Sequence, residues 1–184
     1  MKSYRFLLPV ISLIILITAC EKNPIIPNEE ELITTMIYTL SPVNGGPNAV
    51  FYFEDSDGDG GAPPIINADS LLANTTYEGV ITMLNKSISP PDNIHEEILE
   101  EGIDHQFFYT STGSSIIILY QDEDNSGLPI GLSTKLMTAD FSTGLLTITL
   151  RHLPEKIGLH VSEGDITNAG GETDIELTFP LVIK

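Results

Sequence analysis

The stretch Asp174-Ile175-Glu176-Leu177-Thr178-Phe179-Pro180-Leu181-Val182-Ile183 places an apolar side chain at every second position. In an extended chain, the apolar residues from 175 to 183 would share one face, while Asp174, Glu176 and Thr178 would take the other. This pattern is typical of a half-buried antiparallel strand. Pro180 has no backbone N–H and would interrupt a central ladder, so we predict that the strand is an edge at that position.

The same alternation recurs through most of the chain. It is strict in Leu146-Thr147-Ile148-Thr149-Leu150-Arg151, and noisier runs lie at 33–40, 49–54, 77–84, 106–110, 115–121 and 130–138. Clusters of Gly, Pro, Asn and Asp separate these runs, and short strands with such punctuation indicate a β-sandwich or a barrel. We predict an all-β fold, namely an antiparallel β-sandwich with an Ig-like or related Greek-key arrangement.

One short acidic helix is expected between the strand-like runs. It follows Pro90-Pro91-Asp92, with Asn93 as the capping residue, Glu96 at the capping-box position and Gly102 at C′. The apolar face would hold Ile94, Ile98 and Leu99, and the opposite face Glu96, Glu97, Glu100 and Glu101. Four acids on one helix could gather a cation, but a solvated face is the simpler interpretation.

The amino-terminal segment has the parts of an export signal. Lys2 and Arg5 precede an apolar run from 6 to 17, and small residues lead to Cys20, the one cysteine of the chain. The run is shorter than the roughly 20 apolar residues of a membrane-spanning helix, and a buried core helix would not need the charged start. The ending resembles a bacterial lipobox. It predicts a signal helix over 1–19, lipidation of Cys20 within a tether over 20–31, and a single β-sandwich domain over 32–184.

The chain is strongly acidic, with 8 Lys+Arg against 26 Asp+Glu and a formal net charge of -18. Nucleic-acid binding depends on Lys and Arg that neutralise phosphates, so we expect no nucleic-acid partner. A hydrophobic content of 41% argues against disorder. Once Cys20 carries lipid, no thiol remains for a disulfide, so the domain must depend on its core, alone or with bound metal ions.

Two acidic turns follow strand-like runs with the shared spacing D-x-D-x-[D/S]-G. They are Asp55-Ser56-Asp57-Gly58-Asp59-Gly60 and Asp122-Glu123-Asp124-Asn125-Ser126-Gly127. Alternate residues of a tight loop can aim their oxygens at one point, and Ca²⁺ takes six to eight oxygen ligands. We therefore hypothesise that calcium is held by Asp55, Asp57 and Asp59, and less strongly by Asp122, Asp124 and Ser126.

The match of both turns to a helix–loop–helix calcium site is incomplete. Loop position twelve, where such a site has a bidentate Glu, falls on Ile66 in the first turn and on Ser133 in the second. Asp, Asn, Ser and Gly are also the residues that ordinary β-turns prefer, because their side chains bond to the turn backbone. Plain turns are therefore the alternative interpretation of both segments.

No motif in the sequence organises a nucleophile, a catalytic metal or a phosphate-binding loop. The four histidines, His95, His105, His152 and His160, have no short metal-ligand spacing. A pair of carboxylates, as in a glycosidase, needs no closeness in sequence and stays open. We expect a protein without catalytic residues, and an envelope hydrolase is the least favoured function.

Four blocks of sequence carry a resemblance to a known family: residues 29–35, 55–61 and 105–108, and the segment 164–176, which begins Gly164-Asp165-Ile166-Thr167-Asn168. They resemble a family of small uncharacterised Gram-negative lipoproteins, sometimes labelled "type 1 periplasmic binding fold superfamily". That label implies an α/β fold, whereas the alternating runs predict strands. The resemblance implies export and lipid anchoring, most simply at the outer membrane, and it brings no activity or site residues.

We expect a lipid-anchored cell-envelope protein that serves as a non-catalytic structural or partner-binding module, with calcium as a hypothesised stabiliser. Its partners would be the membrane, through the lipid, and an envelope protein or a glycan. The alternative is a lipoprotein that captures a ligand or glycan for a transport system. A carrier should show a deep pocket lined by Tyr and Phe, whereas an interaction module should show flat sheet faces and charged loops.

Overall fold

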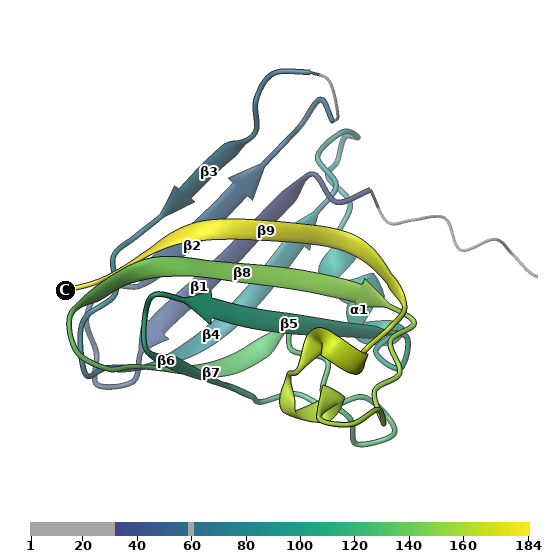
Figure 1. Ribbon diagram of the computed structural model, residues 1–184. Coiled ribbons are helices and arrows are strands. Elements are labelled where there is room, and N and C mark those ends of the chain that lie inside the picture. Colours follow the sequence, from purple (N-terminus) through teal and green to yellow (C-terminus); the bar gives the residue numbers. More distant parts are fainter. Residues whose placement is uncertain (1–31, 59–60) are drawn as a thin grey trace, which may run out of the picture.

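The computed structural model describes residues 32–58 and 61–184, which form two antiparallel sheets packed face to face (Figure 1). The all-β sandwich expected from the alternating runs is confirmed. The predicted signal helix over 1–19, the tether over 20–31 with Cys20, and Asp59 of the first acidic turn lie outside the described residues.

The wider sheet has six strands in the order β3-β2-β1-β4-β7-β6. These strands are β1 (Thr35–Pro42), β2 (Ala49–Glu54), β3 (Ile65–Ala68), β4 (Thr76–Leu84), β6 (Ile116–Tyr120) and β7 (Ser133–Thr138). Strands β1, β2 and β3 pair in sequence, and β4 returns to pair with the other side of β1. Because a Greek key has this spatial order, 4-1-2-3, the predicted Greek-key element is present in this sheet.

The narrower sheet has three strands in the order β5-β8-β9: β5 (His105–Thr112), β8 (Ser142–His152) and β9 (Glu172–Ile183). Strand β9 is an edge strand, which confirms the prediction made from Pro180. Two short 3₁₀ helices, η1 (Val161–Glu163) and η2 (Ile166–Asn168), lie between β8 and β9 in the sequence. They belong to a small second cluster in which Phe108 of β5 packs with Val161 and Ala169.

The main core lies between the two sheets, and Tyr38 of β1 is at its centre. This fully buried ring meets the edge of Phe51 at a centroid distance of 6.3 Å and the tilted ring of Tyr109 at 5.7 Å. Phe51 in turn lies 5.6 Å from Phe179 of the opposite sheet. The Tyr38 hydroxyl is hydrogen bonded to the hydroxyl of Thr134 at 2.7 Å, which satisfies a buried polar group. Burial raises the pKa of Tyr38 far above its ordinary value, so the phenol stays neutral.

Every run that the sequence predicts as a strand contains a strand of the structure. Strand β3 was not predicted, because its adjacent Ile65 and Ile66 break the alternation and it is only four residues long. It forms because β2 offers a ladder, in which Phe51 pairs with Ala68 and Phe53 with Ile66. Tertiary pairing therefore supplies what the local pattern lacks.

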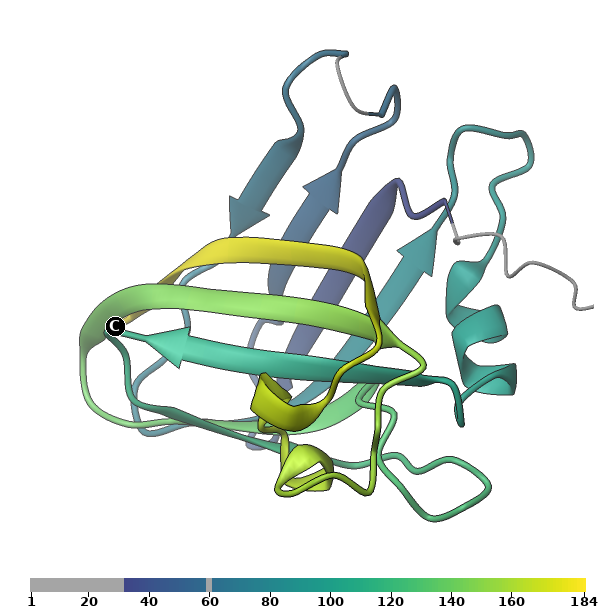
Figure 2. The ribbon, with the colours of Figure 1, turned by 45° about the vertical axis from the view of Figure 1, so that its right-hand side comes forward.

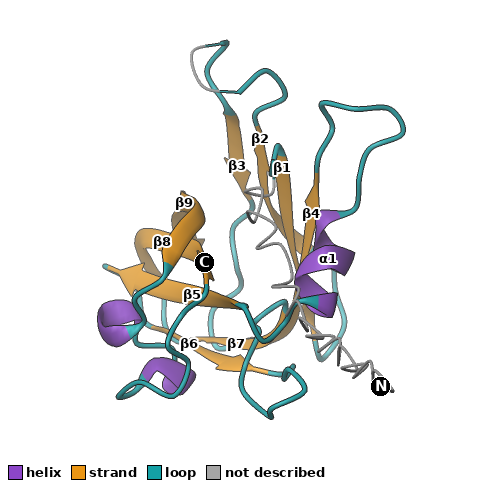
Figure 3. Cartoon of the chain, turned by 90° about the vertical axis from the view of Figure 1, so that its right-hand side faces the viewer, coloured by secondary structure: helices purple, strands orange, loops and turns teal. Residues whose placement is uncertain are grey.

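The predicted helix is present as α1 (Ile94–Glu100), which packs against β4 (Figure 3). Asn93 occupies the amino-terminal cap position, as predicted, but its side chain makes no capping hydrogen bond, so the prediction of a capping box is wrong. The backbone N–H of Asn93 instead donates to the carboxylate of Asp92 at 3.0 Å. The loop before the helix thus uses the neighbouring aspartate rather than the expected capping box.

The carboxyl end of α1 also differs from the prediction. Leu99, expected on the apolar face, is 51% exposed, whereas Ile94 and Ile98 are buried. Gly102 is buried and does not adopt the left-handed conformation of a C′ residue. A Cβ atom at Gly102 would lie 2.6 Å from Cδ1 of Ile130, so the position requires a small residue because of packing.

Within residues 32–58 and 61–184, no helix has the length and the apolar character needed to cross a membrane.

Candidate functional site

The described chain enters the sandwich at one end, which we call the entry end. Strands β2, β4, β6 and β8 finish there, since they run antiparallel to their neighbours (Figure 2). The loops that follow them, 55–64, 85–104, 121–132 and 153–171, carry most of the acidic residues of the domain. The turns at the opposite end, 43–48, 69–75, 113–115 and 139–141, contain two acids, Asp69 and Asp140. Charge is therefore concentrated at the entry end.

The first acidic turn borders a cavity of about 520 Å³ at the entry end. Asp55, Asp57 and Asp174 contribute carboxylates to its lining, and apolar residues such as Phe53 and Ile175 complete it. The turn aspartates also bond to their own backbone. Asp55 accepts from the N–H of residue 58 at 3.0 Å, and Asp57 from that of residue 62 at 2.9 Å. The calcium hypothesis at this turn needs Asp59 as well, so it stays a prediction.

The two lysines of the entry-end loops are each paired with an acid. Lys86 donates to Glu54 at 2.6 Å, in a pair whose side chains are about a quarter to a third exposed. The hydrogen bond from Lys86, with a second one from the Tyr52 hydroxyl, lowers the pKa of Glu54 to about 2. The same contact with Glu54 raises the pKa of Lys86. This exposed pair therefore stays charged over the whole physiological pH range.

The second acidic turn is organised around a buried lysine. The ammonium group of Lys156, 4% exposed, donates to Asp124 at 2.9 Å and to the carbonyl oxygens of Gly102 and Pro129. Burial lowers the pKa of Lys156, and the facing Asp124 opposes that shift. For Asp124, burial acts to raise the pKa, but hydrogen bonds from Lys156 and from two backbone amides outweigh it, and the pKa is lowered. The lowered pKa keeps Asp124 ionised at neutral pH, and its carboxylate faces the Lys156 ammonium group.

The four carboxylate oxygens of Asp122 and Asp124 already accept hydrogen bonds. Those of Asp122 accept from the N–H groups of Gly131 and Ser133, at 2.8 and 2.9 Å. Oδ1 of Asp124 accepts from the N–H of Ser126, and Oδ2 accepts from Lys156. A protein cation thus lies against this turn. Within the described ranges, no three His, Cys, Asp or Glu side chains are placed to hold a metal ion, and calcium binding by Asp122, Asp124 and Ser126 stays a prediction.

Two histidines that the sequence presents as scattered come together at the entry end. The register of β5 and β8 pairs His105 with His152, and their buried rings stack at a centroid distance of 5.0 Å. Nε2 of His105 lies 3.8 Å from the carboxylate of Asp174, which also borders the 520 Å³ cavity. The sequence spacing gives no signal of this cluster, because strand pairing alone joins positions 105, 152 and 174.

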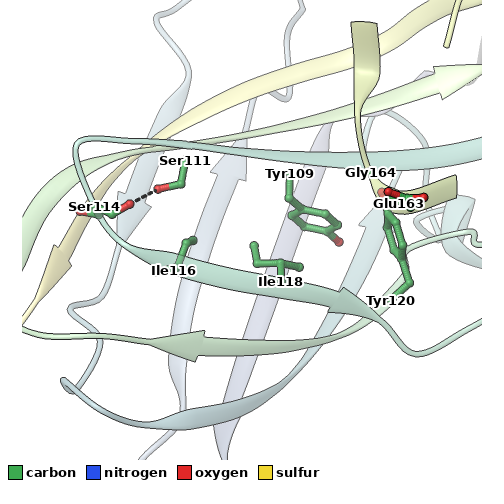
Figure 4. Close-up of a pocket in the computed structure, with 8 residues that line it drawn as sticks. All are labelled: Tyr109, Ser111, Ser114, Ile116, Ile118, Tyr120, Glu163 and Gly164. Carbon is green, nitrogen blue, oxygen red and sulfur yellow. Dashed lines mark hydrogen bonds between the residues drawn. The ribbon is translucent and has the colours of Figure 1, made fainter. Parts of the chain in front are cut away.

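A groove follows the seam between β5 and β6, the strands at which the two sheets end on one side (Figure 4). Its cavity of about 230 Å³ is bordered by Ile116 and Ile118 of β6 and by the rings of Tyr109 and Tyr120. Both hydroxyls bond to backbone carbonyls: Tyr109 donates to residue 131 at 2.5 Å, and Tyr120 to residue 107 at 2.7 Å. Burial raises the pKa of Tyr120 to about 12, so the ring stays neutral.

The seam groove continues past Tyr120 into an acidic cavity. This second cavity measures about 610 Å³, and Tyr120 borders both spaces. Asp122 and Glu123 border the second cavity, and Glu163 borders the first. The open side of β6 therefore has one half that combines apolar, tyrosine and serine side chains, with Glu163 at its border, and a second half that is acidic. The sequence predicts Asp122 as a calcium ligand, but it gives no indication that Asp122 lies beside this groove.

Comparisons of the chain with protein-family models, with curated proteins and with solved structures find no match.

The buried pair gives a test of the second turn. Replacing Asp124 by Asn would leave the Lys156 ammonium buried without its counter-charge, so we expect the free energy of unfolding to fall by about 3–5 kcal/mol in urea denaturation. Because folding lowers the pKa of Asp124, its stabilisation is present at neutral pH and is lost as the pH falls through that lowered pKa. The control Glu54→Gln, in the exposed pair, should change stability much less.

The double variant Asp124→Asn/Lys156→Met tests whether the stability lost in Asp124→Asn comes from the uncompensated charge of Lys156. Removing both charges should restore most of the lost stability, since no uncompensated ion remains. If Asp124→Asn alone were as stable as the unmodified chain, the organising role of the pair would be wrong.

Proposed function

We propose that this chain is a lipid-anchored protein of the bacterial cell envelope, and that its β-sandwich binds a partner protein without catalysing a reaction. The observation that carries the proposal is the exposed edge strand β6. This strand has the sequence IIILY, and it is apolar on both faces. Ile117 is 58% and Leu119 47% exposed on the outer face, while Ile116 and Ile118 border the seam groove.

Edge strands of soluble proteins are normally protected by charges, prolines or a covering segment, because an apolar edge invites pairing with other chains. Strand β6 carries neither charge nor proline. Such an edge is expected where a partner covers it. The charged loops of the entry end and the broad outer sheet face also agree with an interaction module.

A ligand- or glycan-capturing lipoprotein is the second candidate. It is favoured by the 520 Å³ cavity at the entry end, which falls within the 300–1,000 Å³ range usual for small-molecule sites. The seam groove, at about 230 Å³, is smaller than that range, and its two tyrosine hydroxyls are engaged by the backbone. The carboxylates of Asp55, Asp57 and Asp174 in the 520 Å³ cavity would suit a cationic ligand rather than a neutral sugar.

Lipid anchoring at Cys20 would limit the distance of the domain from the membrane. The twelve residues from 20 to 31 span at most about 40 Å when fully extended. The acidic loops of the entry end would be repelled by anionic headgroups.

The anchor is tested by Cys20→Ser in the full-length chain, with Cys20 intact as the comparison. We expect incorporation of an alkyne-labelled fatty acid, and recovery in the membrane fraction, to be lost in the variant. A variant that kept the fatty-acid label would contradict lipidation at this residue.

Partner binding is tested with a photo-crosslinking amino acid placed at Leu119 on β6, in cells that express the full-length chain. The matched control is the same group at Thr178, an exposed position on the outer face of β9. We expect one discrete adduct from position 119 and none from position 178. Equal labelling at both positions, or none at position 119, would count against a partner at the β6 edge.

A further inference from the structure

The open side of β6 presents backbone groups that no neighbouring strand pairs, and one of them, the carbonyl of Tyr120, accepts a hydrogen bond from the Gln121 side chain at 2.7 Å. In the ladder between β6 and β7, Ile116 lies opposite Thr138 and Tyr120 opposite Thr134. Just beyond the two ends of this ladder, the N–H of Ala139 donates to the carbonyl of Ser115, and the N–H of Gln121 donates to that of Ser133. Because hydrogen-bonded pairs alternate in an antiparallel ladder, the N–H and C=O groups of Ile117 and Leu119 also face β7. Those of Ile116, Ile118 and Tyr120 face the opposite, open side.

The described part of the chain supplies no backbone hydrogen bond to these three residues on the open side. Strand β5 lies across the groove, but its edge is partly covered by another segment. The N–H of Phe107 donates to the carbonyl of Ile130 at 2.7 Å, and the carbonyl of Phe107 accepts from Tyr120. The array on β6 therefore faces an opening, and β5 does not complete the sheet.

The residues that border this opening become more acidic from Ile116 towards Asp122. Beside Ile116 and Ile118, the groove is bordered by these two aliphatic chains, by tyrosine rings and by the polar residues Ser111 and Ser114. Beyond Tyr120 the larger cavity is bordered by Asp122 and Glu123, and Glu163 lies close to the junction. An occupant that matches both halves is apolar at alternate positions and positively charged at one end.

We propose that the β6 edge binds an extended segment of a partner protein, which adds as an antiparallel seventh strand with alternate apolar side chains and with Lys or Arg at its amino end. All ladders between the named strands are antiparallel, and an antiparallel segment places its amino end beside Asp122 and Glu123. Backbone pairing supplies affinity in this mode of recognition, and alternate side chains supply specificity. The inference rests on the proposed partner-binding function and deepens it.

A second copy of this chain is a poorer occupant. Each copy carries a net charge of -18, and the groove itself is bordered by acids, so two copies would repel each other at this edge. A basic segment gains from the same charges. Strand β6 has five residues, so a segment that pairs with it along its whole length would be a short strand of ordinary size.

The test measures binding of a synthetic peptide, acetyl-Lys-Lys-Val-Thr-Val-Thr-Val-amide, to the full-length chain in detergent. The control peptide has the same composition in reversed order, with its lysines at the carboxyl end. We expect the first peptide to bind at least about tenfold more tightly, since only its charges reach the acidic half in an antiparallel arrangement. Equal affinities would overturn the proposed direction.

Two variants of Ile118 separate backbone pairing from side-chain contact. Ile118→Pro removes an N–H that faces the open side and leaves the hydrogen bonds to β7 in place. Edge strands accept proline at positions of this kind, where the N–H faces away from the sheet. Ile118→Ala removes the side chain and keeps the N–H. Proline should weaken peptide binding by about tenfold more than alanine does. Equal losses would show that the contact does not run through the backbone and would overturn strand addition.

Folding of each Ile118 variant is checked by its thermal unfolding curve. Should Ile118→Pro not fold, a peptide with N-methyl groups on alternate residues applies the same test to the unmodified chain, and full affinity of that peptide would overturn the proposal. The double variant Glu123→Gln/Glu163→Gln should weaken the lysine-first peptide and leave the reversed peptide unchanged. An equal effect on both peptides would overturn the charge match.

Two other outcomes are decisive. A β6-dependent dimer in sedimentation equilibrium would make a second copy the occupant and would overturn the proposal. A discrete adduct at position 119 in cells, with no binding of either peptide, would keep the partner-binding function and overturn the extended basic segment as its occupant.

Discussion

The structure depends on the burial of apolar strand faces between two sheets of unequal width. Six strands face three, and the aromatic contacts of Tyr38, Phe51 and Phe179 link the two layers at their middle. Apolar burial is the main favourable contribution to such a fold, because no disulfide assists it within the described residues. The narrower sheet ends at β5, so the inner side chains of β6 are only partly buried. The edge of β6 is uncovered because the two sheets differ in width.

The direction of the strands explains why charge gathers at one end. Alternate strands finish at the entry end, and the long loops there carry most of the acids and the buried Lys156–Asp124 pair. The ends of β5 and β8 bring His105 and His152 together at the same end. The opposite end has short turns with little charge. Because β6 finishes at the entry end, its apolar residues lie beside Asp122 and Glu123. A partner that recognises this edge would meet an apolar and an acidic surface in sequence, which favours a segment with the complementary pattern.

The sequence predicts the fold well because alternation is a local signal. The strands, the edge position of β9 and the existence of α1 follow from neighbouring residues, whereas the missed β3 and the cap of α1 depend on β2 and on Asp92. The site is harder to predict. Lys156 meets Asp124 across 32 residues, and His105 meets His152 only through the register of β5 and β8. The spacing of these residues in the sequence gives no indication of such contacts. The aspartates of the second turn suggested a bound cation, and the structure places a lysine there.

Amide hydrogen exchange along β6, measured residue by residue in the full-length chain, tests whether the outer edge of this strand is uncovered. An uncovered edge predicts alternation: the amides of Ile117 and Leu119, which face β7, should exchange slowly, and those of Ile116, Ile118 and Tyr120 should exchange much faster. Uniform slow exchange across the five residues would contradict the account, because it would show that the outer side of β6 is already hydrogen bonded.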